Sequence, residues 1–155
     1  MHTHFLQQAV DLAVINAQMG NGGPFAAIIC QDQKIIATCT NSVTRTNDPT
    51  AHAEIMAIRS ACTQFNTFQL TDCVLYTSCE PCPMCLGAIY WARLKQVYFA
   101  CTRYDAAQAG FDDSFIYDEI AERAENRKIA MQHIELKESF SPFIAWQEQE
   151  NNIPY

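Results

Sequence analysis

The sequence predicts a three-layer α/β/α sandwich built around a mixed five-stranded sheet. The chain has 155 residues, a length that suits one compact domain. After an opening hairpin, short apolar segments of strand length alternate with segments of helical periodicity, which is typical of a sheet covered by helices. No repeat, linker or low-complexity tract interrupts this alternation, so we expect residues 1–155 to form a single domain.

The first half of the chain contains two helical segments and a hairpin. Apolar residues recur at helical spacing over Thr3–Met19. The short apolar run Phe25–Cys30 is typical of a buried strand, and Asp32-Gln33 predicts a tight turn into a second strand over Lys34–Thr40. A loop follows, and helical spacing returns over Ala51–Phe65.

The second half repeats the alternation of strands and helices. Cys73–Thr77 and Gln96–Cys101 are short apolar runs, and Gln132–Lys137 alternates polar with apolar residues, so all three are predicted strands. The helices expected between and after these strands are Pro83–Arg93, Ile116–Glu125 and Pro142–Glu150.

The charge balance is acidic. The net charge is -7 and the isoelectric point about 4.9, with ten Lys and Arg against seventeen Asp and Glu. Long nucleic acids bind mainly through Lys and Arg that neutralise phosphates. We therefore expect a small, weakly charged substrate and no long nucleic acid partner.

The chain start and the cysteines indicate a cytoplasmic protein. The residues Met1–His4 carry no Lys or Arg, and no apolar run approaches the roughly 18 residues of a membrane span, so neither a signal peptide nor a membrane partner is expected. Eight cysteines without a secretion signal do not predict disulfides. Cys30, Cys39, Cys73 and Cys101 lie in apolar strand-like runs and are expected to be buried, reduced thiols.

Two short motifs carry the chemistry: His52-Ala53-Glu54 and the run Glu80–Cys85. Each follows a predicted strand and opens a predicted helix. In an open α/β sheet, the loops that leave the carboxyl ends of strands form the usual site. We therefore expect both motifs to meet at one edge of the sheet.

Cys82 and Cys85 are spaced for metal binding. Residues three apart lie on one side of a helical turn, and the positive end of a helix favours thiolate over thiol. Two thiolates and one imidazole form a ligand set suited to Zn²⁺ and leave a fourth position for water. A site of this form is catalytic, because structural zinc normally has four protein ligands.

The spacing of His52 and Glu54 constrains the start of their helix. Residues two apart on a helix lie about 200° apart around its axis. Both can face one metal only if His52 stands at the very start of the helix, which a cap at Thr50 would achieve. Glu54 can then reach a metal-bound water without binding the metal itself.

Two other readings of the cysteines are weaker. Cys79, Cys82 and Cys85 form a run that resembles iron–sulfur ligation, but no further Cys completes the set. Cys79 is instead expected to end the third strand as a small buried residue. A zinc module without catalysis is the non-enzyme alternative, and Glu54 argues against it because a purely structural site needs no carboxylate beside an open position.

His-x-Glu followed by Pro-Cys-x-x-Cys resembles the signature of zinc nucleobase deaminases, the cytidine-deaminase-like superfamily. Within this superfamily the chain is similar to the small bacterial guanine deaminases over essentially its whole length. The stretches that carry this further resemblance are Gly22–Phe25, Asn41, Gly87–Arg93, Ala109–Tyr117 and Ser141–Phe143, together with the terminal Tyr155.

The resemblance implies a zinc-dependent hydrolase that converts guanine to xanthine and ammonia. One Zn²⁺ per subunit would be bound by His52, Cys82 and Cys85 and would supply a nucleophilic water at neutral pH. Glu54 would take the water proton, pass it to a ring nitrogen and later help to protonate the departing amine. Asp113 would be a second catalytic residue, acting in proton transfer or amine recognition.

The same resemblance implies the substrate contacts and a homodimer. Asn41 would hydrogen-bond the purine, Phe25 would stack on it and Trp91 would wall the pocket. Tyr155 would close the pocket, because the C-terminal segment of about residues 140–155 is exchanged between subunits in this family.

A tRNA adenosine deaminase and a cytosine deaminase share the fold and the zinc motifs and remain the alternative enzymes. An enzyme that acts on tRNA must bind a folded RNA, and the net negative charge of this chain disfavours such binding. The segment Gly110–Asp113 and the aromatic C-terminus also favour guanine.

Overall fold

The computed structural model describes residues 2–155, which separate into two compact units divided after Asp113. The sheet and all of the buried side chains belong to the first unit. Its elements are α1 (His2–Gln18), β1 (Ala26–Gln31), β2 (Lys34–Thr40), α2 (Val43–Thr46), α3 (Ala53–Phe65), β3 (Val74–Cys79), α4 (Pro83–Trp91), β4 (Gln96–Cys101) and α5 (Arg103–Gln108).

The sheet has the order β2-β1-β3-β4. β1 is antiparallel to both β2 and β3, whereas β3 and β4 are parallel. The sheet is therefore mixed, as the sequence predicts, and β2, β3 and β4 all end at the same edge. The hairpin turn is also confirmed: Asp32 and Gln33 both have positive φ, at 47° and 66°, which is typical of a two-residue β-hairpin turn.

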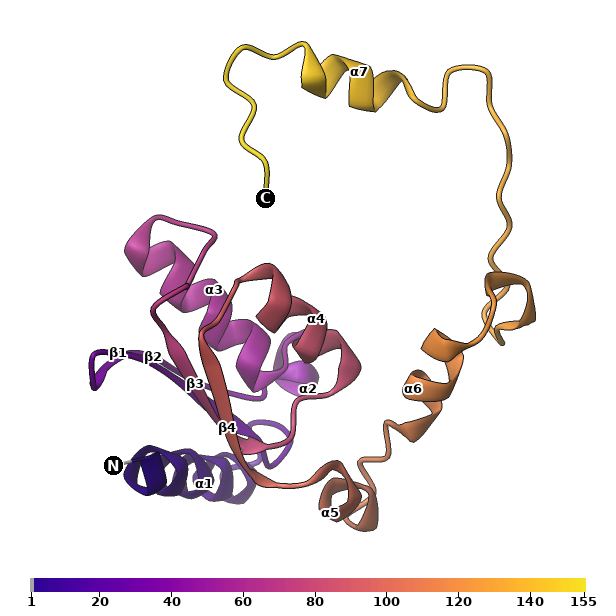
Figure 1. The fold of residues 1–155 in the computed structure, drawn as a ribbon. Helices are drawn as coiled ribbons and strands as arrows, with labels where there is room; N and C mark the ends of the chain where they lie inside the picture. Colours follow the sequence, from indigo (N-terminus) through magenta and orange to yellow (C-terminus); the bar gives the residue numbers. More distant parts are fainter. Residues whose placement is uncertain (1) are drawn as a thin grey trace. The chain divides into compact units, whose positions relative to one another are not determined.

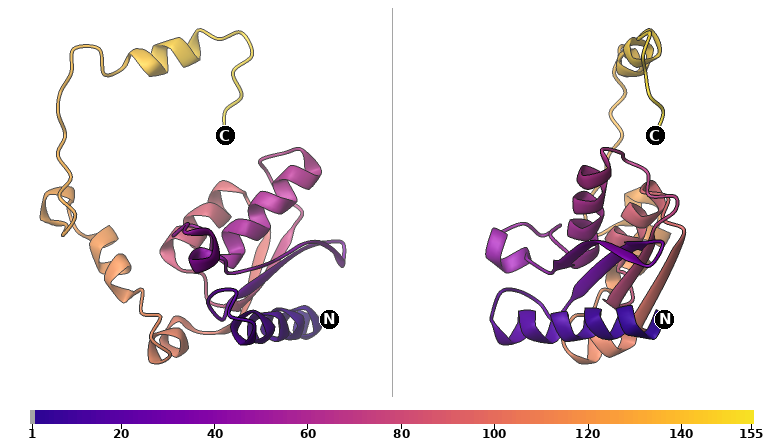
Figure 2. Two further views of the ribbon diagram at one scale, coloured as in Figure 1. Left: turned by 180° about the vertical axis from the view of Figure 1, so that it is seen from behind. Right: turned by 90° about the vertical axis from the view of Figure 1, so that its left-hand side faces the viewer.

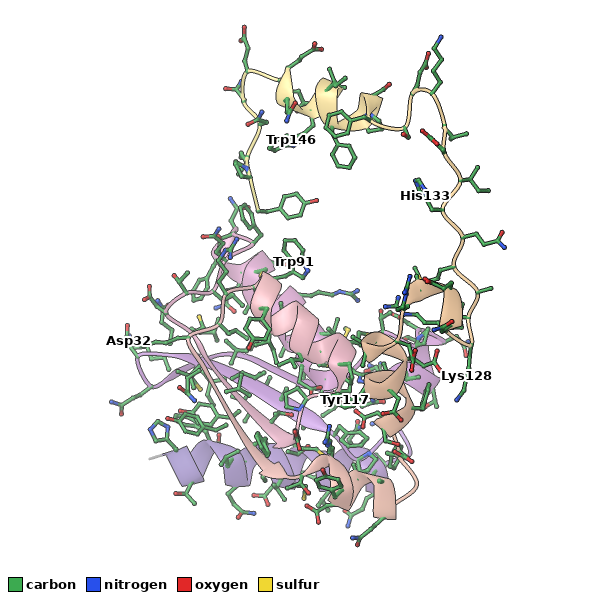
Figure 3. All side chains as sticks on the ribbon, turned by 45° about the vertical axis from the view of Figure 1, so that its right-hand side comes forward. Asp32, Trp91, Tyr117, Lys128, His133 and Trp146 are labelled. Atoms are coloured by element: carbon green, nitrogen blue, oxygen red, sulfur yellow. The ribbon has the colours of Figure 1, made fainter. Side chains whose placement is uncertain are left out.

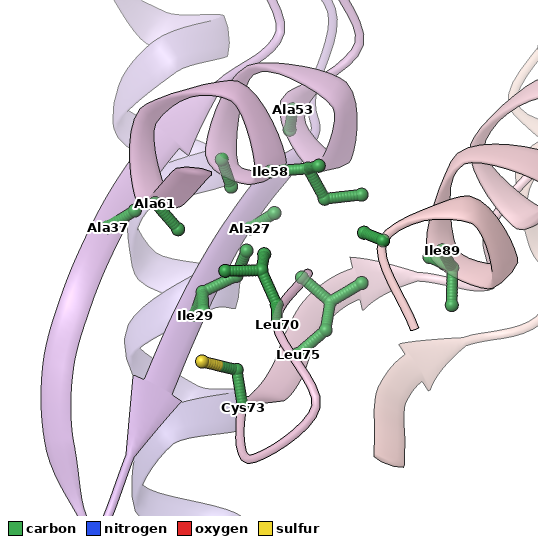
Figure 4. Close-up of a cluster of buried hydrophobic side chains, with 12 residues drawn as sticks. Ala27, Ile29, Ala37, Ala53, Ile58, Ala61, Leu70, Cys73, Leu75 and Ile89 are labelled. Atoms are coloured by element: carbon green, nitrogen blue, oxygen red, sulfur yellow. The ribbon is translucent and has the colours of Figure 1, made fainter. Parts of the chain in front are cut away.

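Helices cover both faces of the sheet (Figures 1 and 2). α1 packs on one face, where Ile28 and Tyr76 lie in its apolar cluster. α3 and α4 lie on the other face, where Ile29 and Leu75 form the larger core with residues such as Ile58 (Figure 4). Ile28 and Ile29 are consecutive on β1, and successive side chains of a strand point to opposite faces of the sheet. One strand therefore contributes to the apolar clusters on both faces. The predicted three layers are thus confirmed.

The second unit, Ser114–Tyr155, contains α6 (Ser114–Ala121), a short 3₁₀ turn at Ala124–Asn126 and α7 (Ser141–Gln147). The predicted fifth strand over Gln132–Lys137 is wrong, because the described residues form four strands and this stretch, marked by His133 in Figure 3, is irregular. Its alternation of polar and apolar residues is real. A strand also needs a hydrogen-bonded partner, which alternation cannot supply.

The described cysteines are all free thiols. Cys30 and Cys73 are buried, as predicted, and Cys39 is half-buried. Cys101 is exposed, which contradicts its predicted burial, because it ends β4 at the edge of the sheet. Within residues 2–155, none of the helices combines the length and the apolar character that crossing a bilayer requires.

Candidate metal centre and adjoining cavity

A cavity of about 350 Å³ lies within the first unit, at the edge where β2, β3 and β4 end. This volume falls in the range of small-molecule sites. Both sequence motifs reach the cavity, since His52 and Glu54 line it together with Glu80 and Cys82. The antiparallel β1 begins at the same edge and contributes Phe25, the residue before it.

His52 precedes the first turn of α3. It is the N-cap of that helix, with extended φ and ψ of -68° and 152°, and its carbonyl accepts the first helical hydrogen bond from Met56 N at 3.0 Å. The helix thus begins two residues later than predicted, and Thr50 is not its cap. The Thr50 amide and hydroxyl instead donate to Asp48 Oδ1, at 2.8 and 2.7 Å. The extended backbone lets the imidazole project beyond the helix, as the spacing of the motif requires.

The two cysteines occupy the start of α4 in the same way. Cys82 is the N-cap, with φ and ψ of -65° and 168°, and Pro83 begins the helix where its missing N–H costs nothing. The carbonyl of Cys82 accepts from Leu86 N at 2.8 Å, and Cys85 lies fully buried in the first turn. Both motifs therefore place a ligand at a helix N-terminus.

The imidazole and the two thiols form a group whose geometry fits Zn²⁺. His52 Nδ1 lies 3.5 Å from Cys82 Sγ and 3.5 Å from Cys85 Sγ, and all three atoms lie within 4.8 Å of one another. A tetrahedral zinc bound to sulfur at about 2.3 Å and to nitrogen at about 2.0 Å holds those atoms about 3.5 Å apart. The donor set and its spacing therefore match zinc. Cys79 is outside this group and ends β3 as a buried residue, as predicted.

The charges of the two thiols are unequal. A hydrogen bond from Cys85 and a second interaction with the His52 imidazole hold the pKa of Cys82 far below that of an ordinary thiol. The pKa of Cys85 is raised, because its proton is shared with Cys82 and its side chain is buried. The lowered pKa of Cys82 favours its thiolate form, and a divalent cation that binds both sulfurs would displace the remaining thiol proton.

Glu54 lies beside this group without belonging to it. It occupies the first turn of α3, is 6% exposed and lines the cavity. Burial raises the pKa of its carboxyl group, and the negative charge of Cys82 adds to the shift. A raised pKa suits a carboxyl group that exchanges protons with a substrate.

Asn41 and Phe25 line another part of the cavity. Asn41 is buried, and its Oδ1 accepts hydrogen bonds from Gly23 N at 3.2 Å and Val43 N at 3.3 Å. Because both donors are backbone N–H groups, the orientation of this carboxamide is fixed and its Nδ2 is the donor left for a ligand. The ring of Phe25 meets the ring of Phe111 edge to face, with centroids 5.0 Å apart.

Asp113 lines the cavity after α5. Partial burial and the negative charge of Cys82 raise the pKa of its carboxyl group, and the positive charge of Arg103 opposes them. Arg103 also lines the cavity, and its backbone N–H donates to Glu80 Oε2 at 3.0 Å. Sequence reasoning missed Arg103 as a cavity residue, although its position just after β4 was an available signal. Glu80 was expected at the site as the start of the second motif, but no role was assigned to it.

The structure does not bring Trp91 to the cavity, as the resemblance had implied. Trp91, labelled in Figure 3, is the last residue of α4, and it is 62% exposed. Cys85 and Cys82 stand at the start of that helix, about 9 and about 13.5 Å away along the helix axis. Tyr155 belongs to the second unit, so its role stays a prediction.

Comparison with known proteins agrees with this geometry. Residues 1–101 match the family described as the cytidine and deoxycytidylate deaminase zinc-binding region. The chain is 56% identical to the guanine deaminase of Bacillus subtilis over 99% of both chains. The crystal structure of that enzyme superposes with a TM-score of 0.98 over 100% of this chain and 99% of the other. A tRNA-specific adenosine deaminase of Aquifex aeolicus is 46% identical over 50% of this chain and 51% of its own length.

Proposed function

Because this chain belongs to the family that shares the cytidine and deoxycytidylate deaminase zinc-binding region, we propose that it hydrolyses guanine to xanthine and ammonia. The assignment of guanine as the substrate rests on the full-length similarity to a guanine deaminase. This similarity extends beyond the zinc-binding region through the second unit. The tRNA-specific relative matches only about half of the chain. The acidic charge balance also favours a small base over a folded RNA.

His52, Cys82 and Cys85 would hold the metal. When bound, zinc supplies the Lewis acidity that makes a water molecule nucleophilic at neutral pH. Zinc held by these three residues would keep one coordination position for water. Glu54 lines the same cavity as His52 and Cys82 and would therefore reach both that water and the base.

Glu54 would move the protons of the reaction. Its carboxylate accepts a proton from the attacking water as the oxygen bonds to C2 of guanine, and it delivers that proton to a ring nitrogen. A second transfer through Glu54 would carry the proton of the new C2 hydroxyl to the exocyclic amine as the carbon–nitrogen bond breaks, so that ammonia leaves and the carbonyl of xanthine forms. The raised pKa of Glu54 suits a group that must both accept and return a proton.

Three other residues would orient the base. Asn41 donates from Nδ2 to an acceptor atom of the purine, because its Oδ1 is already occupied by backbone N–H groups. Phe25 provides an aromatic face on the cavity wall, supported by Phe111. The carboxylate of Asp113 can accept a hydrogen bond from the 2-amino group.

Ultraviolet assays of the purified protein with guanine, adenine, cytosine and tRNA in parallel test the substrate. We expect rapid turnover of guanine alone. Turnover of tRNA or cytosine in place of guanine would overturn the proposal and identify one of the alternative deaminases. The Glu54→Gln protein is the control that links any turnover to this cavity.

We also propose that the protein is a homodimer in which about residues 140–155 are exchanged and Tyr155 closes the partner's cavity. Within the second unit no side chain is buried, although the unit carries many apolar residues, including Leu136, Phe140, Phe143 and Trp146. A segment of this composition does not build a core of its own and needs another surface to cover it.

Subunit complementation tests this arrangement. If Tyr155 acts on the partner's cavity, a heterodimer of Glu54→Gln and Tyr155→Ala chains contains one intact site, made of Glu54 from one chain and Tyr155 from the other. Co-expression of the two chains under different tags should therefore restore activity that neither variant has alone. If Tyr155 acts within its own chain, the heterodimer stays as inactive as its parents.

A cytoplasmic location is part of the proposal. All eight cysteines of the chain are free, and a reducing compartment keeps thiols in this state. The two thiols of the metal group depend on it, because oxidation would remove their ability to bind zinc. Fractionation of the native host cells, followed by detection of the protein, tests the location directly.

A further inference from the structure

Asn16 is a buried polar residue at a position where helix α1 otherwise presents apolar side chains. The buried residues of α1 are Phe5, Ala9, Ala13 and Asn16, which share one face of the helix. Asn16 is 4% exposed, and a buried carboxamide is retained in an apolar stripe only where its hydrogen bonds are satisfied.

The carboxamide of Asn16 joins two segments that line the cavity. Its Nδ2 donates to Gly23 O at 2.9 Å and to Asn41 O at 3.0 Å. Both acceptors are backbone carbonyls, so the orientation of the amide is fixed by chemistry. Gly23 lies before β1 and Asn41 directly after β2. Asn16, on α1, therefore links the start of one strand to the end of its neighbour.

The same two segments hold the side chain of Asn41. Gly23 N and Val43 N both donate to Asn41 Oδ1, so a shift of residue 23 relative to residue 41 weakens one of the two hydrogen bonds that orient the carboxamide. The approach is also close. A Cβ on Gly22 would lie 2.2 Å from Asn41 O, so the backbones of the two segments are in close contact at this point.

We propose that Asn16 is a positioning residue that fixes the direction in which Asn41 Nδ2 donates to the substrate. The inference rests on the proposed function, since it concerns the group that would meet the purine. Asn16 does not line the cavity, and it acts on the Asn41 side chain through the backbone of Gly23 and Asn41.

A double-mutant cycle on guanine binding tests this role. All measurements use the zinc-loaded Glu54→Gln protein, which cannot turn guanine over, with equilibrium dialysis of labelled guanine as the readout. Asn16→Leu and Asn41→Ala should each raise the dissociation constant roughly tenfold, the loss of about one hydrogen bond. The double variant should bind no more weakly than Asn41→Ala alone, because Asn16 has nothing left to position.

Matched variants keep the result decisive. Gln18→Leu removes an exposed amide from the same helix and should leave guanine binding unchanged, and zinc content should stay at one per chain throughout. If Asn16→Leu does not fold, Asn16→Ser gives the same cycle with a smaller side chain. Additive effects of the two substitutions, or unchanged binding in the Asn16 variants, overturn the positioning role. Guanine turnover by the wild-type enzyme tests the proposed function separately.

Discussion

The two ends of the cavity are built by different means. The metal end is defined by His52, Glu54, Cys82 and Cys85. Each of these residues is the N-cap or lies in the first turn of a helix. The two residues on α3 are two positions apart in sequence, and the two on α4 are three apart. At the Asn41 end, defined by Gly22, Gly23 and Asn41, the groups are held by backbone N–H groups and carbonyls from distant parts of the chain.

This difference determines what each end can tolerate. The proposed function of the metal end depends on a few side chains, so one substitution there would remove a proposed ligand or the proposed proton carrier. At the Asn41 end the proposed donor Nδ2 depends on a backbone arrangement, so a substitution in the surrounding backbone would move that donor without removing it. We therefore expect losses of chemistry at the first end and losses of substrate affinity at the second.

The largest effect is expected from Cys82→Ser. Serine is a poor zinc ligand, so zinc content by plasma emission spectroscopy should fall from one per chain to near zero and activity to background. The matched control is Cys79→Ser, in the same cysteine run but outside the metal group, whose Sγ contacts Thr102 O at 3.6 Å. Full zinc content in Cys82→Ser, or its loss in Cys79→Ser, would contradict the ligand assignment.

Glu54→Gln should separate metal binding from proton transfer at the same end. The amide keeps the shape of the buried side chain but cannot carry a proton, so kcat should fall by about 10²–10⁴-fold while zinc content stays at one per chain. Steady-state kinetics and metal analysis on one preparation check both outcomes. Activity close to that of the wild type would remove the proton-shuttle role of Glu54.

Gly22→Ala should affect the Asn41 end through geometry alone. The added Cβ would lie 2.2 Å from Asn41 O, so the segment must move. We expect the free energy of unfolding to fall by about 1–3 kcal/mol. We also expect KM to rise by a larger factor than kcat falls. Gly87→Ala in α4 is the control, because its Cβ meets nothing within 4 Å. A helical Gly→Ala change of that kind should stabilise by about 0.5–1 kcal/mol. Equal effects of the two substitutions on KM would contradict the close-approach argument.

The same contrast explains what the sequence could and could not predict. Zinc ligands and Glu54 were predictable because their chemistry lies in local spacing at the starts of two helices. Asn16 was not predictable, because nothing near it in the chain shows that it contacts Asn41. Arg103 was missed although its position just after β4 was a signal. Trp91 was placed in the cavity by resemblance, but the length of α4 carries it away from the zinc ligands.

The fold divides in the same way. Strands β1 to β4 and the hairpin turn follow from local apolar patterns and from the two residues of the turn. The stretch 132–137 has the alternation of a strand, yet strand formation depends on a partner edge that lies elsewhere in sequence or in another chain. The prediction of Thr50 as the helix N-cap was wrong because Thr50 instead donates hydrogen bonds to Asp48 in a local turn.

The smallest expected effect concerns that turn, which leads the chain into the metal end. Hydrogen bonds from the Thr50 hydroxyl and amide, with a weaker contribution from Arg59, hold the pKa of Asp48 below its usual value. A carboxyl group whose pKa is lower in the folded state adds stability above its unfolded pKa of about 3.9, and that contribution is lost as the pH falls through the folded value.

Asp48→Asn keeps an acceptor oxygen but removes the charge. It should therefore be slightly less stable than the wild type from pH 7 down to about pH 4 and approach it at lower pH. Urea unfolding of both proteins across this range measures the difference, and a gap that stays constant down to pH 3 would show that geometry and not charge holds the turn.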